Sequence, residues 1–242
     1  MKVLVLGATG LTGRLVVKLL LDRDIQVRAL QRTNRSFFET TKNYKLLEVV
    51  TGNICEFDIS ENSELIKGCD AIVCCLGHNL TLKGLFGKPR MLVSDSIKNI
   101  CSAIEHSRKD KVKLVLMNTT AHINKPIDEN YSFFDRAILS LLYYFLPPHK
   151  DNVEAATYLT NVIGESNLSI EWIAVRPDSL INQENVSKYE ILDSIKRSPI
   201  FDAGVTGRIN VAHFIVELLV DEKLWNKRKF QMPVIYNCDK SI

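Results

Sequence analysis

The chain has 242 residues and a formal net charge of +3, from 31 basic and 28 acidic side chains. This near-neutral balance argues against a nucleic-acid binder, whose surface would carry a strong basic excess. Hydrophobic residues make up 46% and charged residues 24% of the chain, which are ordinary globular values. We expect one folded domain over residues 1–242, because folds that alternate strands and helices often reach this size undivided.

Targeting and metal-binding signals are weak in this sequence. Met1 leads directly into a predicted strand, so we expect no secretory signal. The longest strongly apolar stretch, about Ala137 to Leu146, is too short to span a bilayer. Six cysteines are scattered without paired C-x-x-C spacing, which favours reduced thiols and argues against a metal site. These patterns predict a cytoplasmic protein that binds neither membrane nor nucleic acid.

A glycine-rich turn joins the first predicted strand, residues 2–6, to a helix whose apolar residues recur at helical spacing. Gly7 would permit a sharp turn, Gly10 would let a pyrophosphate approach the backbone, and Gly13 would let helix and strand pack closely. The spacing G-x-x-G-x-x-G is a variant of the dinucleotide-binding fingerprint, and an ordinary turn without a ligand is the alternative. The predicted cofactor-binding residues here are Gly7, Thr9, Gly10, Leu11, Thr12, Gly13 and Arg14.

This turn resembles the nucleotide-binding turn of the atypical and extended short-chain dehydrogenase/reductase superfamily. Within it, the nearest groups are the NmrA-like and the flavin- or biliverdin-reductase-like NAD(P)H-binding proteins. Strand and helix segments alternate along the chain, which predicts an α/β fold with a doubly wound parallel sheet. The resemblance implies a Rossmann-type sheet with flanking helices, in a single domain with a small C-terminal extension on the substrate side.

The second strand, residues 24–30, is followed by a basic loop. An acidic residue at this place would bond the adenine ribose 2′-hydroxyl and favour NAD(H). No acid occurs between residues 26 and 38, and Arg32 is well placed to bind a 2′-phosphate. Further candidates for this contact are Arg14, Thr33 and Arg35. We therefore expect NADP(H) in preference to NAD(H), with exposed loop charges at Arg32 and Arg35 as the alternative.

Two later strands end in residues that the resemblance also assigns to the cofactor. In the resembling families the loop after the third strand contains an acid that meets the adenine, and here Asn53, followed by Ile54, replaces it. An amide can still donate to and accept from an adenine edge. Leu76 and Gly77, which end the fourth strand, resemble the backbone approach to the ribose and diphosphate. His78 follows directly, but a lone loop histidine is more often a surface residue.

The expected reaction machinery departs from the superfamily pattern. The resemblance implies a serine at the end of the fifth strand, and Thr119 or Thr120 takes that place. The expected Tyr-x-x-x-Lys is missing, because the match at residues 236–240 lies too near the C-terminus. His149 and Lys150 instead precede a predicted helix over residues 151–166. We predict Lys150 as a ligand of the nicotinamide ribose and His149 as a proton donor, with an exposed helix entry as the alternative.

Other segments are expected to build the fold. The apolar stretch 133–146 is interpreted as mostly core or subunit interface. Arg176, in the segment Arg-Pro-Asp-Ser-Leu, resembles a superfamily turn beside the cofactor and could equally form a structural salt bridge. Asn210 is predicted to cap the last long helix at its N-terminus.

Three functions agree with these residues. The first is an NADP(H)-dependent oxidoreductase in which Thr119, His149 and Lys150 serve the reduction of a small carbonyl, quinone or flavin-like acceptor. The second is a non-catalytic NmrA-like sensor of NADP(H) that acts through a protein partner. The third is a non-redox isomerase or dehydratase on the same fold. The expected ligand is a small molecule of unknown identity, and a homodimer or a protein partner is compatible with the sequence.

Overall fold

The computed structural model describes residues 1–33, 44–78, 81, 85–107, 110–124, 127, 129 and 131–238. The predicted contact at Arg35 and the distant Lys240 lie outside these residues. In the described part of the chain, an eight-stranded sheet has the order β3-β2-β1-β4-β5-β6-β10-β8. Its neighbouring strands run parallel, except that β8 pairs antiparallel with β10 at one edge. The order reverses on either side of β1, as in a doubly wound fold.

The strands of this sheet are β1 (Lys2–Leu6), β2 (Gln26–Gln31), β3 (Leu47–Thr51), β4 (Ala71–Cys74), β5 (Val112–Met117), β6 (Ile170–Pro177), β8 (Tyr189–Leu192) and β10 (Val234–Asn237). A separate parallel pair consists of β7 (Ser179–Ile181) and β9 (Val205–Gly207). Along the sequence, β7, β8 and β9 lie between β6 and the helix that follows residue 207. The small C-terminal extension that the resemblance implies is therefore an insertion at residues 178–207, after which the chain returns to the sheet as β10.

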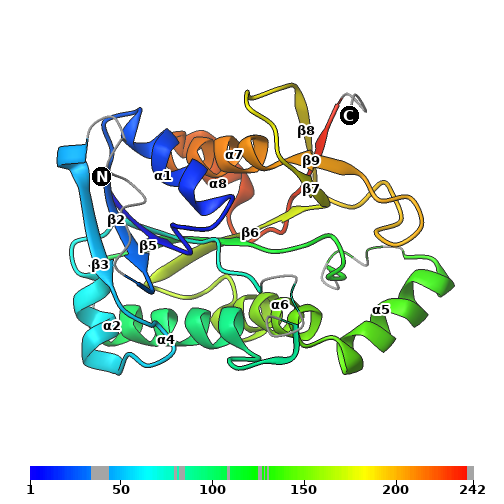
Figure 1. Ribbon diagram of the computed structural model, residues 1–242, viewed down its shortest axis with the longest axis horizontal. Helices are drawn as coiled ribbons and strands as arrows, with labels where there is room; N and C mark the ends of the chain where they lie inside the picture. The colour runs from blue at the N-terminus through cyan, green and yellow to red at the C-terminus, as the bar shows by residue number, and fades with distance from the viewer. Residues whose placement is uncertain are drawn as a thin grey trace.

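Helices cover both faces of the sheet, in the three-layer arrangement of Figure 1. One face carries α1 (Gly13–Leu21), α7 (Arg208–Val220) and α8 (Glu222–Arg228). The opposite face carries α2 (Ile59–Ile66), α4 (Leu92–Ser107) and α6 (Pro147–Tyr158), which continues into a π-helical turn at Leu159–Ile163. The helix α5 (Phe133–Phe145) extends from one end of this second layer, and a 3₁₀ turn at Tyr44–Leu46 precedes β3.

The core follows directly from the two-sided covering of the sheet. Along β1, Val3 and Val5 pack on the α1/α7 side, whereas Leu4 and Leu6 pack on the α2/α4/α6 side. All four are fully buried. Because both faces of each central strand are covered, the strands are continuous apolar runs rather than alternating ones. The predicted fold class, an α/β doubly wound parallel sheet, is confirmed.

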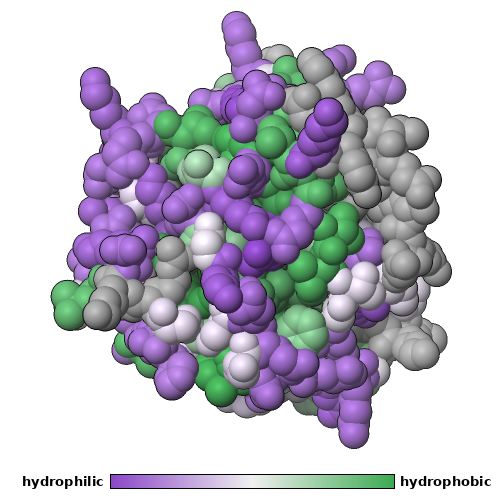
Figure 2. Space-filling model, turned by 90° about the vertical axis from the view of Figure 1, so that its left-hand side faces the viewer, coloured by the Kyte–Doolittle hydropathy of each residue, from purple (hydrophilic) through white to green (hydrophobic). Residues whose placement is uncertain are grey.

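The β3 edge of the sheet is protected by charge. Glu48 on β3 forms ion pairs with Arg28 on the neighbouring β2 and with Lys2 on β1. Figure 2 shows the side of the molecule at the left of Figure 1, where hydrophilic side chains interrupt the hydrophobic surface. Charged side chains on an edge strand oppose pairing with another sheet.

The α2 helix is capped by Asp58, whose carboxylate accepts from the Glu61 amide in a reciprocal capping box. Two predicted helix boundaries are wrong. The α6 helix begins at Pro147, four residues before the predicted start, because proline suits the first turn of a helix. Gly207 is the N-cap of α7, and the side chain of Asn210 bonds Ser187 and Asn237 instead.

The apolar stretch 133–146, interpreted from the sequence as mostly core or subunit interface, is largely exposed in the structure. It forms α5 and the residue after it, but Asp135 and Leu139 are the buried residues of that helix. Most of its aromatic side chains are exposed. The core interpretation is therefore wrong for this face, because no element among the described residues covers it.

Candidate functional site

The glycine turn has the backbone geometry that its spacing predicts. Gly7 has φ +74°, and a Cβ atom there would lie 2.6 Å from the Cys75 carbonyl oxygen. A Cβ atom on Gly13 would lie 2.1 Å from the Gly7 carbonyl oxygen. The turn closes with a hydrogen bond of 2.9 Å from the Gly10 amide to that same oxygen. Gly7 therefore supplies a left-handed turn, and Gly13 allows α1 to begin directly against it.

The first turn of α1 is open to an anion. Thr12, at its N-cap, makes no side-chain cap hydrogen bond, and the first turn contains no acidic residue. The amides of Arg14 and Leu15 in this turn donate to the carbonyls of Gly10 and Thr12 at 3.0 Å each, so the positive end of the helix dipole is what favours a phosphate here. Thr12 and Gly13 are themselves buried, whereas Leu11 and Arg14 are exposed beside the turn.

A cavity opens beside this turn at the carboxyl ends of the central strands. Its lining residues come from the glycine turn, the ends of β2, β3 and β4, and the start of α4. They are Gly7, Thr9, Gly10, Leu30, Arg32, Gly52, Asn53, Ile54, Cys75, Leu76, Gly77 and Leu92. The structure thus brings eight of the predicted cofactor residues, from four separate segments, to one cavity.

The charge of this cavity favours an anionic ligand. Arg32 is the one charged side chain in its described lining, and no carboxylate takes part in it. Gln31 points elsewhere, because its side-chain amide nitrogen (Nε2) donates to the Thr51 hydroxyl at 3.2 Å. Thr33 is exposed and does not line the cavity. An arginine without a competing acid is the arrangement that suits a phosphate-bearing ribose.

Asn53 lines the cavity but is already engaged within its own loop. Its side-chain amide donates to Glu56 at 2.7 Å, and its side-chain oxygen accepts from the Cys55 amide at 3.3 Å. Each end of the carboxamide thereby has one partner within the loop, and one N–H and one lone pair are left over. The adjacent Ile54 is buried and, with Leu30 and Leu92, gives this end of the cavity an apolar wall.

The end of β5 presents one hydroxyl group at the carboxyl edge of the sheet. Thr119 is half-buried, and its hydroxyl oxygen accepts from the Ala121 amide at 3.2 Å. This contact uses a lone pair and leaves the hydroxyl hydrogen available for donation. Thr120, in contrast, is buried, and its hydroxyl bonds the Asp178 carboxylate. Thr119 therefore fits the predicted serine position better than Thr120.

A buried carboxylate joins several of the segments that surround this cavity through hydrogen bonds. Asp151 on α6 is fully buried and accepts from the amides of Val93 and Ser94 at 2.8 Å each. The same carboxylate bonds Nε2 of His78 at 2.8 Å. These four residues, the Asp151 cluster, join the start of α4 and the loop after β4 to α6.

Next to the Asp151 cluster, the residue that follows β5 is hydrogen-bonded to α6. The side-chain amide of Asn118 donates to the Asn152 carbonyl at 3.0 Å, and its oxygen accepts from the Thr119 amide at 2.8 Å. Asp151 and Asn152, in the second turn of α6, thus position the start of α4 and the loops that follow β4 and β5. Sequence reasoning missed these roles, because His78 and Asp151 are 73 positions apart.

His149 and Lys150 lie on α6, on the side that faces α5. His149 is buried, and a ring N–H donates to the Leu139 carbonyl on α5. Burial lowers the pKa of His149, although this hydrogen bond opposes the shift. In its neutral form the second ring nitrogen is an acceptor, so the geometry favours accepting a proton over donating one. Lys150 is exposed, with its Nζ atom 5.5 Å from the centre of the Tyr143 ring.

A buried ion pair supports the loop that follows Thr119. Arg176 bonds both oxygens of Glu129, at 2.7 and 2.9 Å, and both side chains are fully buried. Glu129 also accepts from the amides of Asn124 and Ile195. Burial alone would raise the pKa of Glu129, but the hydrogen bonds and charge of Arg176 reverse the effect and lower it. The structural alternative for Arg176 is confirmed.

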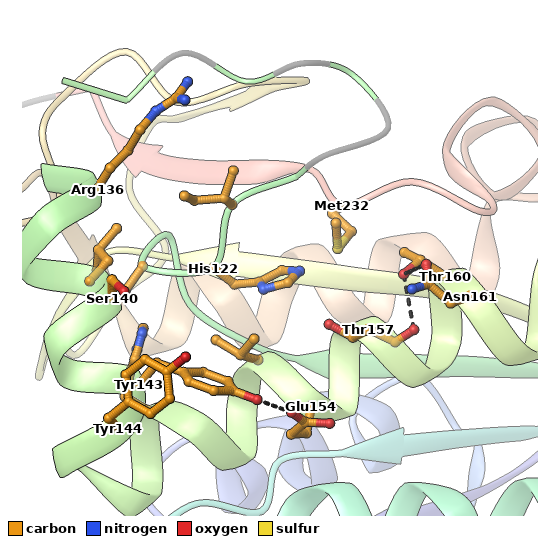
Figure 3. Close-up of a pocket in the computed structure, with 15 residues that line it drawn as sticks. His122, Arg136, Ser140, Tyr143, Tyr144, Glu154, Thr157, Thr160, Asn161 and Met232 are labelled. Atoms are coloured by element: carbon orange, nitrogen blue, oxygen red, sulfur yellow. Dashed lines mark hydrogen bonds between the residues drawn. The ribbon is translucent and has the colours of Figure 1, made fainter. Parts of the chain in front are cut away.

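A second cavity of about 430 Å³ lies between α5, α6 and the loop after β5. We call it the α5–α6 pocket; it is lined by Ala121, His122, Ile123, Arg136, Leu139, Ser140, Tyr143, Tyr144, His149, Val153, Glu154, Thr157, Thr160, Asn161 and Met232. Figure 3 shows His122 between the tyrosines of α5 and the polar end formed by Thr157, Thr160 and Asn161. The Tyr143 hydroxyl donates to Glu154, and this bond, with burial, raises the tyrosine pKa to about 12.

The strand order, the glycine turn and the cavity beside it define a dinucleotide-binding domain of the Rossmann type. A family model described as NAD(P)H-binding matches residues 7–222, so the chain belongs to this NAD(P)H-binding family. The predicted relation to NAD(P)H-binding proteins is therefore confirmed. No curated protein matches the chain in sequence.

Solved structures share the fold over nearly the whole chain. A putative NADH-flavin reductase from Streptococcus pneumoniae TIGR4 is 16% identical with a TM-score of 0.67, covering 98% of this chain and 99% of its own. An anaerobillin reductase from Escherichia coli O157:H7 is 16% identical with a TM-score of 0.68, covering 100% of both chains. A short-chain dehydrogenase/reductase from Veillonella parvula DSM 2008, in complex with NADP, is 14% identical with a TM-score of 0.66, covering 100% and 96%. At these identities the likeness establishes the fold alone.

Other expectations concern the cysteines, metals and membranes. All six cysteines are free thiols, and burial raises the pKa of Cys74 to about 12. Within the described residues no cluster of His, Cys, Asp or Glu could hold a metal ion. Likewise, no described helix is both long and apolar enough to cross a bilayer.

Proposed function

We propose that the protein is an NADP(H)-dependent oxidoreductase that reduces a small carbonyl, quinone or flavin-like acceptor. The observation that carries this proposal is the convergence of the glycine turn, Arg32 and the Leu76–Gly77 loop on one cavity. The nucleotide would lie along the turn with its diphosphate at the start of α1 and its 2′-phosphate at Arg32. When bound, NADPH supplies the hydride at the carboxyl edge of the sheet.

The chain's own residues would then orient the acceptor. Thr119 would donate its hydroxyl hydrogen to the acceptor oxygen, because its bond from the Ala121 amide uses only a lone pair of the hydroxyl oxygen. The α5–α6 pocket, which begins at Ala121, offers an apolar space with polar groups at one end for an acceptor with an aromatic ring. Solvent supplies the proton, so no tyrosine is needed. His149 as a proton donor and Lys150 as a ribose ligand remain predictions.

The first test compares the two nucleotides. We expect NADPH to bind the purified protein more tightly than NADH, and Arg32→Ala to weaken NADPH binding about 10- to 100-fold, as for a lost charged hydrogen bond. NADH binding should stay unchanged in this variant, and Lys18→Ala, at an exposed position of α1, serves as the matched control. Equal affinity for both nucleotides in the wild type would contradict the cofactor preference, and no binding of either would contradict the function.

The second test addresses catalysis. Oxidation of NADPH by quinones, flavins and aldehydes should be detectable and should fall at least tenfold in Thr119→Ala, while Thr119→Ser retains it. Tight NADPH binding without oxidation by any acceptor would favour the NmrA-like sensor instead. One observation supports that second function: Lys150 is directed to Tyr143 rather than to the cofactor cavity.

A further inference from the structure

The outer face of α5 carries an uncovered row of large apolar side chains. Its members are Phe133, Phe134, Leu141, Tyr144 and Phe145, which are 80%, 69%, 58%, 76% and 71% exposed. Their spacing follows the helical repeat, so they lie along one side of the 13-residue helix with Ala137 and Ser140 between them. We call this set the α5 stripe. Other exposed apolar residues, such as Leu168, lie on other segments of the chain.

Polar contacts, rather than burial of an apolar face, position α5 at its N-terminal end. Ser132 caps the helix, and the Asp135 carboxylate bonds the hydroxyls of Ser132 and Ser198. At the other side, Leu139 is buried and its carbonyl accepts from His149. The helix is thereby fixed with its apolar stripe turned outward. A helix that is hydrophobic on nearly all sides is normally covered by other protein.

The size of the α5 stripe matches one half of a symmetric interface. Four aromatic rings and one leucine at these exposures present roughly 600 Å² per copy, since each aromatic side chain contributes about 150–250 Å² when buried. Two copies would bury on the order of 1,200 Å², which is the lower limit of stable specific interfaces.

The charges of α5 favour a second copy over a lipid surface. The sequence of α5 contains two charged residues, of which Asp135 is buried and Arg136 lies beside the α5–α6 pocket. The α5 stripe itself is uncharged, so self-pairing brings no like charges together. A helix that lies on a membrane normally carries several Lys or Arg residues on its polar face, and α5 carries one.

We propose that two copies of the chain associate through antiparallel packing of their α5 stripes about a two-fold axis. A two-fold interface uses the same surface on both partners, and an antiparallel pair centred near Leu139 places Phe134 opposite Tyr144 and Phe133 opposite Phe145. These aromatic pairs add to the apolar burial. Because Tyr144 belongs both to the α5 stripe and to the α5–α6 pocket, the second copy forms part of the border of that pocket. This inference is independent of the proposed function.

Sedimentation over a concentration series tests the proposal. The wild type is expected to sediment at twice the chain mass of 27.5 kDa at micromolar concentration. Leu141→Glu should raise the dissociation constant at least 100-fold, whereas Leu168→Glu, which also charges an exposed leucine, should leave it unchanged. Circular dichroism of each variant confirms that it is folded. A wild type that stays monomeric at 100 μM overturns the proposal, and so does a dimer that Leu141→Glu does not weaken.

A mixing experiment tests the antiparallel arrangement. Phe134→Glu and Tyr144→Lys chains should each be monomeric alone. Mixed together, they should form a heterodimer with one Glu–Lys pair and one unchanged Phe–Tyr pair. No recovery on mixing would contradict this register. Flotation of the monomeric wild type with phosphatidylcholine and phosphatidylglycerol vesicles would identify a lipid surface instead and overturn the dimer.

Discussion

The two sides of the candidate site are built by different means. On the cofactor side, the walls are mostly backbone: the glycine turn, the Gly52 loop and the Leu76–Gly77 loop approach one another closely. On the acceptor side, side chains from distant segments hold the loop after Thr119, chiefly through Glu129 and Arg176. A binding surface made of backbone needs space that an added side chain would fill. A network of side-chain hydrogen bonds is instead weakened by the loss of any one member. The two sides should therefore respond differently to substitution.

The largest expected effect is on the acceptor side, where the ion pair is buried. Arg176→Met leaves the Glu129 carboxylate buried without its partner, which should lower the free energy of unfolding by about 3–5 kcal/mol. Arg197→Met, which breaks the more exposed pair with Asp202, should cost less than about 1 kcal/mol. Urea unfolding measures both. Similar losses in the two variants would contradict the comparison.

On the cofactor side, the corresponding change is one methyl group. Gly13→Ala places a Cβ atom against the Gly7 carbonyl oxygen and should weaken NADPH binding by about 2 kcal/mol or more, roughly 30-fold. Gly68→Ala is the control, because the added carbon has no atom within 4 Å there, although the positive φ of Gly68 strains an alanine. Both variants should lose some stability, and only the first should lose affinity. Unchanged affinity in Gly13→Ala would contradict this prediction, because it would show that the glycine turn can shift without weakening NADPH binding.

The Asp151 cluster lies between the two sides and should give an intermediate effect. In Asp151→Asn the amide nitrogen cannot accept from Val93 or Ser94, and one buried N–H is left unpaired at a cost of about 1–3 kcal/mol. Hydrogen exchange at those two amides should accelerate, and NADPH should bind less tightly because Leu92 borders the cofactor cavity. Asp95→Asn, at an exposed position of the same helix, should change neither.

The smallest effect concerns pH. Burial holds the pKa of His149 below its ordinary value of 6.5, so the unfolded chain binds more protons below that pH. Stability should therefore fall as the pH drops through 6.5, by at most about 1.4 kcal/mol per pH unit for this one group. His149→Gln should flatten that slope, and His106→Gln, at an exposed position of α4, should not. An identical slope in all three proteins would contradict the assignment.

The contrast also explains what could be predicted from the sequence. The strand order and the turn at Gly7 and Gly13 follow from apolar runs and glycine spacing, which are local patterns. The hydrogen bond between His78 and Asp151 joins residues far apart in the chain. No local sequence pattern around either residue indicates this contact. The exposure of α5 was likewise hidden, because a run of apolar residues has the same composition whether it is buried or uncovered.

The Asp151 cluster also has a consequence for the growing chain. The α4 amides that it binds precede it by 57 and 58 residues, and β5 and α5 are made in between. A nascent chain that stops before residue 151 can form the glycine turn and the first strands, but it has no carboxylate for the start of α4. Domains generally fold as units during synthesis, so the cofactor site should be completed only after α6 has left the ribosome.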